Sequence, residues 1–245
     1  MIPRFYCPFP LHPGATVQLP DDTAHHALRV LRVAEGDAAV LFDGRGGQWS
    51  ATLHPAGKGL RATLHEFDTD DREPPLAITL AQCLPAADKM DYVVQKAVEL
   101  GVSVIQPVAA KRSVIRLSGD RMERRLAHWR SIAIAACEQC GRNRVPEIAP
   151  ILDLPQYLAQ ASAHNQPRWI CLPPEQGAAL QLRERPPPGP ALTLLIGPEA
   201  GYEEAEIKAS AAAGFVRVQL GPRILRSETA GPAALAAVLS LWGDI

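Results

Sequence analysis

Two glycine-containing segments in the second half of the chain could hold a small ligand. The first reads Gly-Pro-Glu-Ala-Gly over 197–201 and directly follows an apolar run that begins at Leu192. The second reads Leu-Gly-Pro-Arg-Ile-Leu-Arg-Ser-Glu-Thr-Ala over 220–230 and precedes an alanine-rich stretch. Glycine lets the backbone approach a ligand closely, and α/β sheets bind ligands where their strands end. Both segments are therefore candidate ligand loops, although each could equally be a tight structural turn.

The second segment leads into a predicted helix. If Thr229 is the N-cap of that helix, Pro232 falls at its third position, where a missing N–H costs little. The loop over 224–228 then lies at a helix N-terminus, whose free N–H groups suit an anionic or carboxylate group. The helix start therefore adds a polar end to the candidate ligand site.

The usual signatures of nucleotide and acyl chemistry are absent from the sequence. It contains no G-x-x-x-x-G-K-[ST] motif, no G-x-G-x-x-G after a predicted strand and no G-x-S-x-G. We therefore do not expect a P-loop NTPase, a standard dinucleotide-binding enzyme or an α/β-hydrolase. An α/β enzyme without these motifs must bind its ligand through other loops.

Cysteine and histidine residues offer weaker candidates. Cys137 and Cys140 have the spacing of a metal or redox pair, but no second pair follows, and both lie near the apolar stripe of a predicted helix. We therefore favour packing over zinc for this pair. His25 and His26 are adjacent, so on a helix they diverge by about 100° and do not face one ion easily. A surface or RNA contact is the better interpretation of the two histidines.

The net charge of −1 conceals a basic region. Residues 86–145 hold 11 basic and 6 acidic side chains, a net charge of +5, and most of the basic residues are arginines. Guanidinium groups pair readily with phosphate, so the region is a candidate RNA-binding surface. The alternative is a solvated helix face whose charges pair with one another.

Two kinds of secondary structure must position these residues. Short strands separated by turn residues are predicted over 16–20, 38–44, 48–54 and 60–67, with one helix over 22–33 that places Ala27, Leu28 and Leu31 on one side, and the pattern is typical of a small β-barrel. The acidic, proline-ended stretch over 68–75 indicates a linker.

After the linker, strands and helices alternate. Apolar strands are predicted over 76–83, 102–108, 169–173, 192–197 and 216–221, and helices over 88–101 and 121–140. The alternation predicts an α/β domain with a mainly parallel sheet. The proline-rich piece over 186–190 is not taken as a second boundary, because the sheet needs the strands on its far side.

Composition also bears on location. No apolar run approaches the roughly 18 to 20 residues of a membrane span, and the proline-rich start is a poor signal peptide. Five scattered cysteines suit a reducing compartment. We therefore expect a cytoplasmic protein without membrane or metal partners.

Motifs along essentially the whole chain resemble those of the RsmE-type 16S ribosomal RNA uridine-N3 methyltransferases, which belong to the SPOUT class. The matching segments are Ile2–Tyr6, His26 with Val30–Arg32, Lys89 with Gln95–Val102, Glu138–Pro146, Ile196–Glu199 and Leu220–Thr229. They occur in the order of the family.

The resemblance implies a fold and a set of partners. Residues 1–70 would form a PUA-like RNA-binding β-barrel, and residues 74–245 would form a SPOUT methyltransferase domain with a parallel sheet and a C-terminal trefoil knot. The protein would be a homodimer that uses S-adenosylmethionine (SAM) to methylate N3 of a uridine in ribosomal RNA or the small ribosomal subunit.

The resemblance also implies site residues. The cofactor-binding positions would be Leu172, Ile196, Gly197, Pro198, Glu199, Gly201, Leu220, Gly221, Ile224, Leu225, Ser227, Thr229 and Ala230. The basic residues expected to bind RNA, from their charge, are Arg29, Arg32, Lys89, Arg112, Arg116, Arg142 and Arg144. Ala200 stands where the family usually has a glycine, so a left-handed backbone there would be strained.

For catalysis, methyl transfer to N3 requires removal of the N3 proton and stabilisation of a developing imide anion. Arg226 is the first candidate for stabilising that anion or a nearby phosphate. Glu199 is a candidate base or holder of the methyl donor, and its simpler interpretation is a cap on the next helix. Two other functions stay open: a non-catalytic RNA-binding module for ribosome assembly, and a zinc enzyme centred on Cys137 and Cys140.

Overall fold

The chain forms two compact units. The computed structural model describes residues 2–69, 71–86, 88–113, 119–163, 165–177 and 179–245. The first unit comprises Met1–Glu73 and Ile134–Val145, and the second comprises Pro74–Ala133 and Pro146–Ile245. The chain thus passes between the units three times: inside the predicted linker, within one long helix, and between Val145 and Pro146.

The first unit contains a five-stranded sheet in the order β1-β3-β4-β5-β2. Its strands are β1 (Arg4–Tyr6), β2 (Thr16–Gln18), β3 (Ala38–Phe42), β4 (Gln48–Ala56) and β5 (Gly59–Asp68). β1 pairs in parallel with β3, and the other pairs are antiparallel. Alternate residues of β4 and β5, among them Leu53, Leu60 and Leu64, are buried in its core. All four strands predicted for this region are present.

The helix predicted over 22–33 is shorter and changes its winding. α1 (Asp21–His26) continues as a π-helical turn, η1 (Ala27–Leu31), and the segment ends at Arg32 in the left-handed conformation with φ 56°. Ala27 is buried, but Leu31 is 46% exposed. The prediction that Leu31 shares the buried side of the helix is therefore wrong, because π-helical winding rotates it out of the stripe.

The second unit contains an eight-stranded sheet in the order β11-β13-β10-β12-β6-β7-β8, with β9 also paired to β7. Its strands are β6 (Ala77–Cys83), β7 (Val104–Ala109), β8 (Glu147–Ile148), β9 (Leu152–Asp153), β10 (Arg168–Cys171), β11 (Leu180–Gln181), β12 (Ala191–Ile196) and β13 (Val216–Gln219). Every pair in the sheet is parallel, as the strand and helix alternation predicted.

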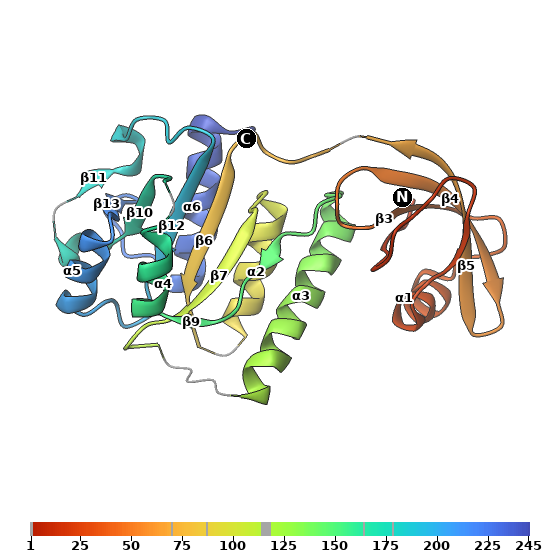
Figure 1. The fold of residues 1–245 in the computed structure, drawn as a ribbon, viewed down its shortest axis with the longest axis horizontal. Coiled ribbons are helices and arrows are strands. Elements are labelled where there is room, and N and C mark those ends of the chain that lie inside the picture. The colour runs from red at the N-terminus through yellow and green to blue at the C-terminus, as the bar shows by residue number, and fades with distance from the viewer. Residues whose placement is uncertain (1, 70, 87, 114–118, 164, 178) are drawn as a thin grey trace. The chain divides into compact units, whose positions relative to one another are not determined.

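Helices cover both faces of this sheet (Figure 1). The helices are α2 (Lys89–Glu99), α3 (Asp120–Cys140), α4 (Leu154–Ala161), α5 (Glu204–Ala212) and α6 (Ser227–Trp242), with 3-10 turns η2 (Pro174–Gln176) and η3 (Leu182–Glu184). α2 packs on α6, and α4 packs on α5. Cys83 of β6 faces the α4 and α5 layer, whereas Gln82 meets α6, as alternation along a strand requires.

The start of α6 differs from the prediction. Arg226 is its N-cap and Ser227 its first residue, so Thr229 lies inside the first turn and Pro232 lies inside the helix. Thr229 as N-cap is therefore wrong. The helix extends two residues further because the N–H groups of Thr229 and Ala230 both find the carbonyl of Arg226, at 2.9 and 2.8 Å.

None of the helices in the described part of the chain has the length and apolar character that a membrane crossing needs.

Candidate functional site

Three loops of the second unit converge on a cavity of about 270 Å³. They follow β10, β12 and β13, which are neighbours in the parallel sheet, so their carboxyl ends meet at one edge. The loops contribute residues from the ranges 171–176, 196–202 and 220–230. Both candidate ligand segments of the sequence therefore reach the same cavity, where an α/β sheet is expected to bind ligands.

Most of the predicted cofactor-binding residues lie around this cavity. Twelve of the thirteen line it, namely Leu172, Ile196, Gly197, Pro198, Glu199, Gly201, Leu220, Gly221, Ile224, Leu225, Ser227 and Ala230. Thr229 is not part of the lining, and its exposed side chain lies in the first turn of α6.

Several lining residues were not among the predicted cofactor-binding positions. These are Cys171, Pro173, Gln176, Tyr202, Arg223 and Glu228, together with Lys89, which was predicted for RNA. Arg223 and Glu228 lie inside the second segment and could have been included with it. Gln176 comes from the η2 turn, for which the sequence carries no motif.

Tyr202 and Gly197 form a tightly packed wall. A Cβ at residue 197 would lie 2.8 Å from the Tyr202 ring, so only glycine fits without a shift. Tyr202 is buried, and its hydroxyl lies 3.5 Å from Cys83 Sγ. Burial raises the pKa of Tyr202 well above its ordinary value, so this hydroxyl stays protonated.

The start of α6 is locked onto the loop after β12. Ser227 Oγ donates to the carbonyl of Gly197 at 2.7 Å, and Gln82 Nε2 donates to Ser227 Oγ at 3.0 Å. Ser227 and Gln82 are both buried. These two hydrogen bonds connect β6, the loop after β12 and α6 at one point beside the cavity.

One cation and two carboxylates form a polar side of the cavity. Lys89 Nζ donates to Glu199 and lies 3.3 Å from a carboxylate oxygen of Glu228. The hydrogen bond to Glu199 raises the pKa of Lys89, so the amine is charged. The capping interpretation of Glu199 is wrong, since the N-cap of α5 is Glu203.

Two arginines of the third loop have no internal partner. Arg223 and Arg226 line the cavity, and the guanidinium group of neither forms a hydrogen bond or ion pair with any residue that the structure describes. Their guanidinium groups therefore remain available to a ligand. Arg226, the first candidate for catalysis, is directly at the N-terminus of α6.

The predicted RNA-binding residues fall into different environments. Arg29 and Arg32 are exposed in the first unit. Arg144 pairs with Asp71 at 2.7 Å and is half-exposed. Arg116 lies outside the described residues.

Arg142 contradicts its predicted role. Its side chain is 3% exposed and forms an ion pair with Glu73. A guanidinium buried in this way is inaccessible to an RNA surface, so the RNA-binding assignment of Arg142 is wrong and the residue stabilises the first unit.

The Gly-Pro-Glu-Ala-Gly turn accommodates Ala200 without a left-handed backbone. Among the described residues other than glycine, only Arg32 has a positive φ. The positive φ of the turn, 69°, belongs to Gly201, whose N–H donates to the carbonyl of Pro198 at 2.9 Å. The strain considered for Ala200 therefore does not arise.

The two cysteines of the predicted helix differ in burial, since Cys140 is partly exposed. Cys137 is buried, its Sγ lies 3.5 Å from the carbonyl of Arg144, and burial raises the pKa of its thiol to about 12. Within the described ranges, no group of three or more His, Cys, Asp or Glu side chains could hold a metal ion.

The family models and the related proteins that match this chain all describe RNA methyltransferases. Residues 72–239 match a model described as an RNA methyltransferase domain, and residues 19–60 match an RNA methyltransferase PUA domain. The ribosomal RNA small subunit methyltransferase E of Synechocystis is 34% identical over 93% of this chain and 74% of its own length. The Bacillus subtilis protein of that name is 30% identical over 91% of this chain and 89% of its own.

Two solved structures are similar over the whole of both chains. The ribosomal RNA small subunit methyltransferase E of Neisseria gonorrhoeae, bound to SAM, is 41% identical with a TM-score of 0.89. A methyltransferase of Legionella pneumophila, in complex with bound SAM, is 32% identical with a TM-score of 0.94.

Proposed function

Because the chain belongs to the ribosomal RNA small subunit methyltransferase E family, we propose that it transfers a methyl group from SAM to N3 of a uridine in 16S ribosomal RNA. The observation that carries the proposal is the cavity at the carboxyl ends of β10, β12 and β13. Its lining includes twelve of the residues that the family resemblance assigns to the cofactor, and two solved relatives carry SAM.

The residues present suit SAM. Leu172, Leu220 and Leu225 give the cavity apolar walls for the adenosine portion. Glu199 and Glu228 place two carboxylates beside Lys89. The excess negative charge of this group suits the positive charge of the methyl donor. The bound donor supplies a methyl group on a sulfonium, and the chain must supply its orientation.

Arg226 is the proposed catalytic group. Loss of the N3 proton leaves negative charge on the uracil imide, and an unpaired guanidinium at the cavity stabilises that charge. Glu199 already accepts a hydrogen bond from Lys89, which favours a role in holding the cationic donor.

We also propose a homodimer in which α6 contacts a second copy. Of its sixteen residues only Glu228 is charged. Leu235, Val238 and Leu239 are buried inside the unit, while Ala233, Ala237 and Leu241 line a groove on another side of the helix. A helix that is apolar all round is typically covered on both sides.

The trefoil knot of the SPOUT class belongs to the same proposal. Hydrogen bonds from Gln82 to Ser227 and from Ser227 to Gly197 join the start of α6 to the loop after β12, and a knotted C-terminal segment would bring these parts together. The ribosomal substrate favours a cytoplasmic location.

The experiment is methyl transfer from labelled SAM to 16S ribosomal RNA and to assembled small subunits, followed by nucleoside analysis. We expect 3-methyluridine as the labelled product and its absence from ribosomal RNA of a deletion strain. Methylation at another position would overturn the N3 assignment. RNA binding without SAM binding would identify a non-catalytic assembly module instead.

A further inference from the structure

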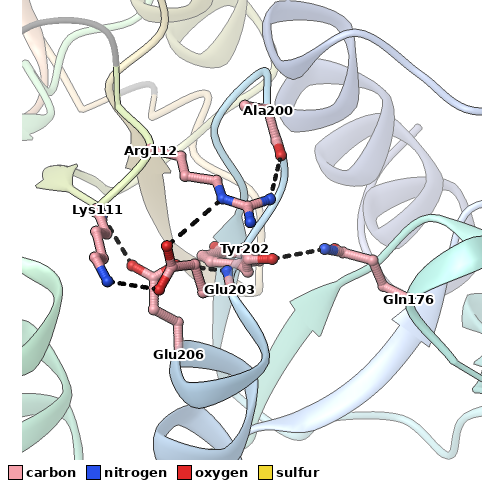
Figure 2. Close-up of polar contacts among 7 residues, drawn as sticks. All are labelled: Lys111, Arg112, Gln176, Ala200, Tyr202, Glu203 and Glu206. Atoms are coloured by element: carbon pink, nitrogen blue, oxygen red, sulfur yellow. Dashed lines mark hydrogen bonds and ion pairs between the residues drawn. The ribbon is translucent and has the colours of Figure 1, made fainter.

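The turn after β7 forms hydrogen bonds with the cavity loop that follows β12, from outside the cavity. This turn, Ala110–Ser113, is closed by two hydrogen bonds, from Ala110 N to Ser113 Oγ at 3.1 Å and from Ser113 N to the carbonyl of Ala110 at 3.0 Å. Lys111 and Arg112 lie at its tip and point toward the loop after β12 (Figure 2). We call residues 197–203 the glycine loop.

Arg112 and Lys111 hold the glycine loop at the end that joins α5. Arg112 Nη1 donates to the carbonyl of Ala200 at 3.2 Å, and Arg112 Nε lies 3.8 Å from Glu203. Lys111 Nζ donates to Glu203 at 2.8 Å, and this hydrogen bond lowers the pKa of the Glu203 carboxyl. The carboxylate is therefore charged near neutral pH and keeps both cations in place.

Glu206 fixes the same junction through the backbone. Its carboxylate accepts the N–H of Lys111 at 2.9 Å and the N–H of Glu203 at 2.8 Å. The turn after β7 and the start of α5 are thus bound to a single side chain (Figure 2).

Gln176 holds the glycine loop from the opposite direction. Its Nε2 donates to the carbonyl of Tyr202 at 2.9 Å, and Figure 2 shows it reaching the loop from the side away from Arg112. Gln176 also lines the cavity. The carbonyls on either side of Gly201 are therefore each taken by a side chain from outside the loop.

We propose that Arg112 and Gln176 are positioning residues that hold the glycine loop in its SAM-binding shape before SAM arrives. The proposal rests on the proposed function of the cavity. A loop already ordered by the protein loses less conformational freedom on binding, so the ligand binds more tightly. Arg112 then acts on the cofactor rather than on RNA.

The first test is SAM binding by Arg112→Ala in the absence of RNA, measured by calorimetry. We expect the Kd to rise by about 2- to 10-fold, the range for loss of one hydrogen bond. The KM for SAM should rise with it, while kcat at saturating SAM and the KM for RNA stay unchanged. Lys208→Ala is the matched control, since Lys208 pairs with Glu204 on the exposed side of α5.

The second test is hydrogen exchange of the glycine loop in the protein without SAM. Arg112→Ala and Gln176→Ala should both accelerate exchange of peptides covering 197–203, whereas Lys208→Ala should not. Arg112→Lys keeps a charged donor group on a single nitrogen and should recover part of the protection.

The outcomes separate the two proposals. Unchanged SAM affinity and unchanged exchange in Arg112→Ala, with weaker RNA binding, would overturn the positioning role and return Arg112 to the RNA surface. A wild-type protein that fails to bind SAM, but whose glycine loop is loosened by both variants, would overturn the proposed function and leave the positioning role intact.

Discussion

At the scale of single residues, Arg226 is distinguished by what it lacks. It lines the cavity without an acidic partner, whereas Lys89 on the same cavity is shared by two carboxylates. An unpaired guanidinium is free to meet charge that develops only during the reaction.

We therefore expect Arg226→Ala to lower kcat by about 100-fold or more, while the Kd for SAM changes by less than about threefold. Single-turnover methylation and calorimetry measure the two quantities. Arg223→Ala serves as the neighbouring comparison. Normal turnover by Arg226→Ala would remove this residue from the mechanism.

Substitutions at Ala200 and at Gly201 should affect stability differently, because only Gly201 has a positive φ. Gly201 has a φ of 69°, and a Cβ there would lie 3.0 Å from Gln176 Nε2, so Gly201→Ala should cost about 1 kcal/mol of unfolding free energy and weaken SAM binding. Ala200→Gly should change stability by less than about 1 kcal/mol. Urea denaturation and calorimetry compare them. Equal losses in both variants would contradict this division.

The burial of the cysteines predicts which thiols react in the folded protein. Burial raises the pKa of Cys7, Cys83, Cys137 and Cys171 to about 12, so at pH 8 only about one in ten thousand of these thiols is ionised. Cys140 is the partly exposed one. Titration with a thiol reagent should show one fast group, which Cys140→Ser removes, and four that react only after unfolding. Fast reaction of several thiols in the native protein would contradict the burial.

The residues of the cavity were more predictable from the sequence than their contacts. The glycines and leucines of two contiguous segments were found because short motifs mark them. The ion pairs of Lys89, Arg112 and Arg142 were missed because their partners lie between 69 and 139 positions away in the chain, as with Glu73 for Arg142. The net charge of a segment does not show which of its side chains form ion pairs with distant parts of the chain.

At the scale of elements, the basic region divides into paired and unpaired arginines. Lys96, Lys111 and Arg144 join Lys89, Arg112 and Arg142 in pairing with acids of the fold. On α3, by contrast, the side chains of four arginines form no hydrogen bond or ion pair with any described residue, namely those of Arg121, Arg124, Arg125 and Arg130. The RNA contribution of the +5 region should therefore come from α3.

We expect RNA affinity to fall steeply with salt and Arg121→Ala/Arg124→Ala to reduce the slope of log Kd against log salt by about 1 to 2. Binding of 16S ribosomal RNA across a salt series measures the slope. Lys96→Ala, which removes a cation paired to Glu99 within α2, should leave it unchanged. A flat salt response of the wild-type protein would exclude this surface.

Helix starts were the least predictable feature of the elements. The sequence around α6 offers Thr229 as a conventional cap, but the helix begins at Ser227 because Gln82 and Gly197 hold that residue from other parts of the sheet. α1 likewise ends early in a π-helical turn. At α6, tertiary contacts therefore outweigh the local preference for Thr229 as the cap.

At the scale of the whole molecule, the parallel pairing of the second sheet followed from the alternation of strands and helices, and the separate β-rich unit followed from its short strands and turns. The order of the strands was not predicted. The return of residues 134–145 to the first unit had no sequence signal. It depends on contacts such as Arg4 Nη2 to Asn143 Oδ1 at 2.6 Å and Tyr6 N to Glu138 Oε1 at 2.9 Å.

The groove along α6 predicts the oligomeric state. If a second copy covers Ala237 and Leu241, then Ala237→Glu should convert a dimer to a monomer, because a carboxylate in an apolar interface loses its hydration. Light scattering after gel filtration measures the mass. Val30→Glu, at an exposed apolar position of the first unit, is the control. A monomeric wild-type protein would overturn the dimer.

The origin of the cavity lining also bears on biosynthesis. Its residues come from position 89 and from three loops that end at position 230 of a 245-residue chain. A nascent chain emerges from the ribosome with its N-terminus first. A product that ends before residue 230 therefore lacks part of the cavity lining. Capture of the methyl donor should therefore begin only after residue 230 has been synthesised, which would make SAM binding to stalled nascent chains a reporter of cavity assembly.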